Sequence, residues 1–235
     1  MTASGFDQFA DTYADDLNQA LAASGESKDY FAQGRVRWLG VCLTRLRDEQ
    51  LGSPLSVLDY GCGVGDTTPH FREFLDARTV VGIDISQRSI NNAQSRYGSP
   101  ANRFATFEDY LPEGSMDLVY CNGVFHHIPV LERRKAVDYI YRCLRPGGLF
   151  ALWENNPWNP GTRYVMAQCV FDHDAIMLSP PEASKLLTCG GFEVVSVTYQ
   201  FVFPKLLRIL RFLEAPLSRL PLGGQYQVLC RKLPA

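Results

Sequence analysis

The chain has 235 residues, of which 46% are hydrophobic and 20% charged, and its formal net charge is −2. This composition is ordinary for one globular domain and excludes a broad basic face for nucleic acid. No apolar run approaches the ~20 residues of a membrane span, and residues 1–10 show no secretory signal. The seven cysteines lack metal-ligand spacing, so we expect reduced thiols and a cytoplasmic location. No carboxylate/histidine metal cluster is apparent in the sequence either, and we expect no bound metal.

Short apolar runs alternate with helical stretches from residue 55 onward. We predict a helix that begins after the N-cap Ser86 and a turn at Arg145–Gly148. Because the strands are separated by helices, right-handed crossovers and a parallel sheet covered on both faces are expected. The predicted strands are residues 55–60, 79–84, 103–107, 117–121 and 149–154.

The C-terminal third has a different pattern. Ser179 and Glu182 have the spacing of a capping box, and the helix that they open would close at Gly190. The strands predicted at residues 193–203 and 225–232 have no ordinary crossover helix between them. An antiparallel pairing at the edge of the sheet is therefore expected.

A glycine loop follows the first predicted strand, in the segment Leu58–Gly65 (LDYGCGVG). Glycines allow the backbone to turn sharply and to approach a ligand closely. A dinucleotide fingerprint that starts at Gly61 would need glycine at position 66, which is Asp66 instead. Asp59, at the strand end, suits a cationic ligand and would repel a pyrophosphate, although it could also be a helix cap.

A second carboxylate, Asp84, ends the second predicted strand, 19 residues after Gly65. In α/β folds this position holds the acid that accepts hydrogen bonds from ribose hydroxyls. The alternative is a simple turn residue at the end of a strand.

Four segments together resemble, in order and spacing, the motifs of class I S-adenosylmethionine-dependent methyltransferases. The resemblance covers roughly residues 55–155, and FDQFADTYADDL near the N-terminus resembles the first helix of the small-molecule members. The four segments are VLDYGCGVG (57–65), VVGIDIS (80–86), MDLVYCNGVFHHI (116–128) and LRPGGLF (144–150).

The resemblance implies S-adenosyl-L-methionine as the cofactor and assigns residues to it. The glycine loop and the end of the fourth strand would contact its methionine part, and Asp84 would bind its ribose. At the adenine end the pattern departs from many relatives, because Phe107 occupies the place of an expected acid; Phe107 would stack on adenine while Glu108 or Asp109 takes the amine. The implied cofactor residues are Asp59, Gly61, Cys62, Gly63, Gly65, Asp84, Ile85, Phe107, Glu108, Asn122 and Gly123.

The expected architecture is an α/β fold, doubly wound, with a mostly parallel seven-stranded sheet and an antiparallel edge strand. N-terminal helices and a C-terminal cover helix would be added to it. We divide the chain into an N-terminal helical lid (1–50), a cofactor-binding core (51–155) and a substrate-side part (156–235) that completes the same domain.

Methyl transfer from a sulfonium is an in-line displacement that mainly requires alignment and exclusion of water. A general base is needed only if the nucleophile must lose a proton. His126, His127 and Glu154 follow the fourth and fifth strands at the edge where α/β sheets hold ligands. We take them as catalytic candidates; the alternative is one packed and one surface histidine.

The acceptor would be a small molecule rather than a nucleic acid. Tyr13, Asn155, Trp158 and His173 are candidate substrate-binding residues, against the alternatives of helix packing, a self-bonded loop and a capping turn. The basic and leucine-rich residues 204–220 suit a cover helix, and they leave peripheral membrane contact or a dimer face open. Oligomeric state is undetermined. The rival functions are a non-catalytic cofactor-binding protein and a nicotinamide oxidoreductase.

Overall fold

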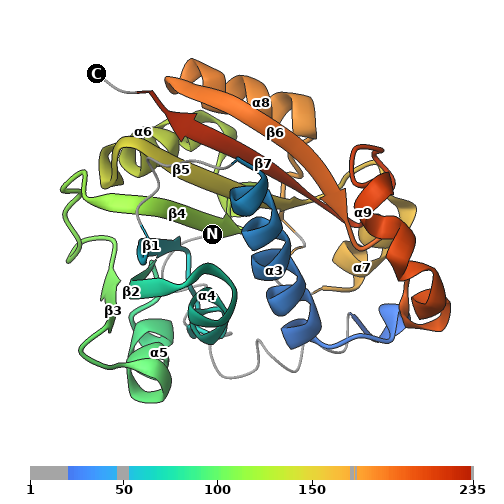
Figure 1. The fold of residues 1–235 in the computed structure, drawn as a ribbon, viewed down its shortest axis with the longest axis horizontal. Helices are drawn as coiled ribbons and strands as arrows, with labels where there is room; N and C mark the ends of the chain where they lie inside the picture. The colour runs from blue at the N-terminus through green and yellow to red at the C-terminus, as the bar shows by residue number, and fades with distance from the viewer. Residues whose placement is uncertain (1–20, 47–52, 170–171, 173, 234–235) are drawn as a thin grey trace.

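The protein is described here from a computed structural model, which describes residues 21–46, 53–169, 172 and 174–233. Its centre is a seven-stranded sheet with the order β3-β2-β1-β4-β5-β7-β6 (Figure 1). Strands β1 to β5 pair in parallel, and β7 lies antiparallel between β5 and the edge strand β6. The predicted fold class is confirmed. The strands are β1 (Leu55–Tyr60), β2 (Ala77–Asp84), β3 (Asn102–Thr106), β4 (Met116–Asn122), β5 (Leu144–Asn155), β6 (Phe192–Gln200) and β7 (Gln225–Lys232).

The helices begin and end at residues with clear local reasons. The Ser86 hydroxyl accepts the N–H of Ser89, which caps α5 as predicted. Ser179 and Glu182 form the predicted capping box of α8. The helices are α3 (Lys28–Leu46), α4 (Thr68–Leu75), α5 (Gln87–Tyr97), α6 (Arg133–Cys143), α7 (Pro160–Gln168), α8 (Pro180–Cys189) and α9 (Glu214–Leu217), with 3-10 helices at Ala22–Ser24, Phe125–His127, Val130–Glu132 and Lys205–Leu213.

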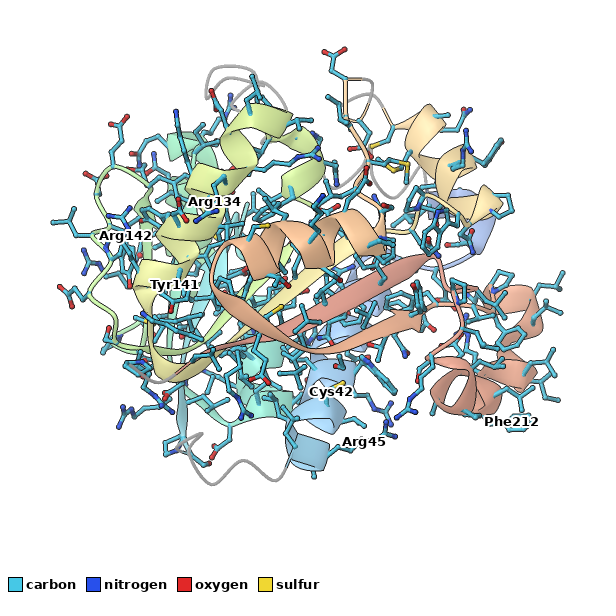
Figure 2. All side chains as sticks on the ribbon, turned by 90° about the horizontal axis from the view of Figure 1, so that it is seen from above. Cys42, Arg45, Arg134, Tyr141, Arg142 and Phe212 are labelled. Carbon is cyan, nitrogen blue, oxygen red and sulfur yellow. The ribbon has the colours of Figure 1, made fainter. Side chains whose placement is uncertain are left out.

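Helices cover both faces of the sheet, because successive strand residues point to opposite sides. Val57 and Leu118 belong to the core that α3 and α4 cover. Their neighbours Leu58 and Val119 belong to the core under α6 and α8. Figures 1 and 2 show the sheet enclosed between these two helix layers.

The turn predicted at Arg145–Gly148 is wrong, because this segment is part of β5. In the pairing of β4 with β5, Met116 is opposite Leu144 and Leu118 is opposite Leu149. The register therefore shifts between these two pairs. The extra residues form an irregularity inside the strand, and Gly147 takes a positive φ of 76° there. Pro-Gly-Gly therefore bends a strand here rather than preceding one.

The segment Lys205–Leu217 is a 3-10 helix followed by the short helix α9. Large apolar side chains point outward from it: Leu206 is 91% exposed and Phe212 73%, and Figure 2 shows Phe212 directed away from the protein. Arg211 fixes the segment through its ion pair with Glu26, at 2.9 Å. Among the helices of the described ranges, none combines the length and the apolar character that a membrane span requires.

Candidate active site

The glycine loop forms a tight turn after β1. Gly61, Gly63 and Gly65 all have positive φ values, of 76°, 53° and 80°. A Cβ atom on Gly61 would lie 2.3 Å from Val124 Cγ2, whereas one on Gly63 would meet nothing within 4 Å. The loop is thus packed on one side and open at Gly63, as a close approach to a ligand requires.

Two carboxylates border this loop. Asp84 accepts the N–H of Gly63 through Oδ2 and the N–H of Ser86 through Oδ1, each at 2.9 Å. Asp59 is 2% exposed, and its Oδ2 has no hydrogen-bond partner within the described ranges. Burial and the charge of Asp84 raise the pKa of Asp59 to about 8, against the opposing effect of Arg35. Asp59 is therefore a buried acid that lacks a cationic or donor partner on one side.

Asp66 replaces the third glycine of a dinucleotide loop, and the structure gives it a different use. It forms ion pairs with Lys28 of α3 and with Arg96 of α5. The Tyr97 hydroxyl also donates to it, at 3.0 Å. These contacts attach two helices to the loop.

The residues expected at the adenine end divide into packed and exposed groups. The Phe107 ring packs against Tyr60, with centroids 4.8 Å apart, so part of it is used inside the core. Asp109 accepts the Thr106 hydroxyl at 2.6 Å. Glu108 is exposed, and Ile85 is 42% exposed.

A cavity of about 380 Å³ opens at the edge of the sheet where β4 and β5 end. Asn122 and Gly123 line it from the end of β4, and Asn155 lines it from the end of β5. Its volume is in the range of small-molecule sites. Aromatic side chains form much of its wall: Tyr30, Phe31, Tyr164, Phe201 and Phe203.

Glu154 holds His126 from behind the cavity. Its Oε2 lies 2.6 Å from His126 Nδ1, and its Oε1 accepts the N–H of Phe125 at 2.8 Å. The two side chains are 1% and 4% exposed, and of the two only His126 lines the cavity. Glu154 thus orients His126 rather than facing the cavity itself.

Asp172 completes a cluster with both histidines, and all three residues line the cavity. Its Oδ1 lies 3.4 Å from His126 Nε2 and 3.4 Å from His127 Nε2. Burial alone would lower the pKa of His126, but the carboxylates of Glu154 and Asp172 raise it to about 10. Burial and the charge of His126 lower the pKa of His127 to about 4.

The end of β5 and the loop after it contain two cavity residues, Asn155 and Asn159, and others that bond within the protein. Asn155 Oδ1 accepts the amide of Gln225, which in turn accepts a guanidinium N–H of Arg35. Asn156 donates to the carbonyls of Pro221 and Gly223 and is fully buried. Trp158 is 51% exposed and does not line the cavity.

The structure thus brings His126, His127 and Asn155 together with the end of β4. Tyr13 and His173 lie outside the described residues. The sequence analysis did not single out Asp172, although it named the adjacent His173 as a candidate.

It also missed Phe201. This residue has a φ of 64°, uncommon for a bulky side chain, and lies against Gly34, where a Cβ atom would be 2.7 Å from its ring. Nothing in the local sequence indicates either feature.

Comparison with known proteins identifies the family. A family model described as a methyltransferase domain matches residues 58–152. An O-methyltransferase of Penicillium expansum, cnsE, is 30% identical over 220 residues, which cover 82% of this chain and 72% of that protein. The chain belongs to the class I S-adenosylmethionine-dependent methyltransferases. The nicotinamide alternative is therefore wrong.

Other methyltransferases show the same relationship at greater distance. A trans-aconitate 2-methyltransferase of Methylobacterium radiotolerans is 27% identical over 127 residues, and the matched part is about half of each protein, 49% and 48%. The solved structure of a methyltransferase from Thermotoga maritima, described as a possible histamine N-methyltransferase, has a TM-score of 0.63 and 18% identity. It covers 97% of this chain and 98% of that one, and shows the shared fold.

The residues of this methyltransferase fit S-adenosylmethionine. The buried Asp59 Oδ2 and Asn122 Oδ1 lack hydrogen-bond partners among the described residues. Both lie at the ends of neighbouring parallel strands, the edge at which such sheets hold ligands. The space above Gly63 leaves room for the cofactor, which supplies a methyl group carried on a sulfonium.

Proposed function

We propose that this methyltransferase methylates a hydroxyl oxygen of a small, largely apolar molecule bound in the cavity. The single observation that carries the proposal is the composition of the cavity wall. Aromatic side chains form one part of it, and His126, His127 and Asp172 form another. Such a wall suits a flat apolar body with an ionisable hydroxyl at one end.

The geometry supports an oxygen acceptor for a chemical reason. A hydroxyl must lose its proton as it attacks the methyl carbon, whereas a neutral amine can attack first. The Asp172 carboxylate or the neutral His127 imidazole can accept that proton, and the His126 imidazolium can stabilise the charge left on the oxygen. Asn122 lies in the same wall, so the cluster is near the strand end assigned to the cofactor's methionine part. The relative from Penicillium expansum, named as an O-methyltransferase, supports the same assignment.

We further propose roles for the remaining site residues. Asp59, Asn122, Gly123 and the loop Gly61–Gly65 hold the methionine part of the cofactor, and Asp84 holds its ribose. Ile85, Phe107 and Glu108 border the adenine. His127 contacts the acceptor, Glu154 positions His126, and Asn155 orients the acceptor through the cavity wall.

The test is methyl transfer with an acceptor panel. Purified protein and S-adenosylmethionine are incubated with matched apolar aromatic compounds that carry a hydroxyl, an amine or a carboxyl group, and the products are identified by mass spectrometry. We expect methyl ethers from the hydroxyl compounds. Products only from the amines or the carboxylic acids would refute the proposal, and so would cofactor binding without turnover on any of them.

A further inference from the structure

His126, His127 and Asp172 form what we call the His–His–Asp cluster. One ligand atom from each residue lies within 4.8 Å of the other two. The Asp172 Oδ1 atom is 3.4 Å from His126 Nε2 and equally far from His127 Nε2. Charge-assisted hydrogen bonds are shorter, at about 2.7–2.9 Å. Two ligands at ~2.0–2.1 Å from a tetrahedral ion are ~3.3–3.4 Å apart, so both distances fit edges of a coordination tetrahedron.

A second observation independently indicates a ligand. The Asp172 side chain is 8% exposed, and its Oδ1 forms no hydrogen bond to any residue that the structure describes. Burying a carboxylate oxygen without a donor is costly. The unsatisfied oxygen points toward the two histidine nitrogens, where a cation would satisfy it.

The surroundings hold the ligand atoms in place. Glu154 Oε2, 2.6 Å from His126 Nδ1, fixes the ring so that Nε2 faces Asp172. This is the carboxylate–histidine arrangement that orients metal-binding imidazoles. The segment after Asp172 is attached to the same histidine, because the Ile176 N–H donates to the His126 carbonyl at 2.8 Å. Arg133 in turn donates to the Ile176 carbonyl at 2.6 Å.

We propose that the His–His–Asp cluster binds one divalent transition-metal ion, such as Zn²⁺ or Mn²⁺, with a coordination position open to the cavity. Two imidazoles and one carboxylate suit these ions, and three protein ligands with an open position are the pattern of catalytic sites. The carboxylates of Asp172 and Glu154 supply two negative charges to balance the ion. A metal-dependent enzyme would then replace the metal-independent one expected from the sequence.

This inference rests on the proposed function in one respect only. The acceptor's hydroxyl oxygen would take the open position, and His127 would be a metal ligand that holds the ion against that oxygen. Metal binding itself can be measured without any acceptor.

The experiment titrates tag-free, full-length protein, previously stripped with a chelator, with Co²⁺ and follows its visible absorption. We expect one Co²⁺ per chain and a band that Zn²⁺ displaces. Asp172→Asn and His127→Ala should abolish the band, and Glu154→Gln should weaken binding by about 10–100-fold. The matched control is His70→Ala, because His70 also contacts two carboxylates, Asp29 at 2.9 Å and Glu73 at 3.7 Å, but lies outside the cavity.

Thermal unfolding and S-adenosylhomocysteine binding show whether each variant is folded. The inference is overturned if the wild type binds no Co²⁺, or if Co²⁺ binding survives in folded Asp172→Asn protein. Hydroxyl methylation at full rate in chelator, with no Co²⁺ band, would overturn the metal site and leave the proposed function intact. A Co²⁺ band that Asp172→Asn abolishes, in a protein that methylates no hydroxyl, would support the metal site and refute the proposed function.

Discussion

The proposed donor end and the proposed acceptor end of the candidate active site are built differently. At the donor end, residues 59–65 and 84–86 are two short turns at the ends of adjacent strands, fixed by glycine conformations and backbone hydrogen bonds. At the acceptor end, the cavity gathers side chains from α3, the ends of β4 and β5, α7 and the segment before β7. The donor end is thus set by local chain geometry, and the acceptor end depends on long-range packing.

The largest effect is expected at the acceptor end, from Glu154→Ala. The change leaves the Phe125 N–H and His126 without their buried partner, and breaking such a pair costs about 3–5 kcal/mol of unfolding free energy. Urea unfolding measures it. The matched control is Asp138→Ala in the half-exposed pair with Arg134 (labelled in Figure 2), where about 0.3–0.5 kcal/mol is expected. Equal losses in the two variants would contradict the prediction.

His127→Ala should affect the acceptor end without affecting the donor end. Because His127 lines the acceptor cavity, its loss should lower kcat by a factor of ~10²–10⁴ while S-adenosylhomocysteine affinity stays unchanged. Steady-state kinetics and titration calorimetry measure these quantities. A parallel fall in cofactor affinity would mean that the two ends are not independent.

Asp84→Asn tests the donor end in the same way. An amide cannot accept hydrogen bonds from both Gly63 and Ser86 through its two terminal atoms, as the carboxylate does. Cofactor binding should weaken by about 1.5–3 kcal/mol, with the KM for the acceptor unchanged. Calorimetry with S-adenosylhomocysteine decides; a loss confined to the KM for the acceptor would reject the assignment.

Substitution by alanine should affect stability and cofactor binding differently at Gly63 and at Gly65. At Gly65 a Cβ atom would lie 3.1 Å from Ala93, Phe104 and Tyr97, so Gly65→Ala adds a clash to about 1–2 kcal/mol of left-handed strain. Gly63→Ala adds strain only, but its Cβ would enter the open space. We expect Gly65→Ala to lower the melting temperature more and Gly63→Ala to weaken the cofactor more; the opposite order would contradict the loop's orientation.

A further prediction, at Asp59, depends on pH. Burial and Asp84 raise the pKa of Asp59 to about 8, whereas an unfolded aspartate titrates near about 4. Between these values the folded chain keeps a proton that the unfolded chain releases, so the contribution of Asp59 to stability falls as pH rises. Asp59→Asn should therefore gain on the wild type from about pH 5 to about pH 8, by roughly ten degrees in melting temperature. A gap that stays constant would contradict the raised pKa.

The same contrast explains what could be predicted from the sequence. Strand β1 was predicted at its observed bounds, because an apolar run between Pro54 and Gly61 defines it. Asp59 and Asp84 could be predicted as donor-end candidates because each lies at the end of a strand. Asp172 could not be found, because its approach to His126 depends on a loop attached through Ile176 and Arg133, far along the chain. Pro-Gly-Gly misled the assignment of β5, since only the register with β4 shows that the strand continues.

The position of β7 has a consequence for how the protein is made. Residues 225–232 lie between β5 and β6, although both of those strands are synthesised earlier. A nascent chain that has reached residue 220 already contains the donor loop, but it lacks the strand that joins β6 to the sheet and the Gln225 side chain that lines the cavity. Such a chain would expose unpaired edges of β5 and β6, which favour aggregation. The acceptor end can therefore form only after β7 has emerged from the ribosome.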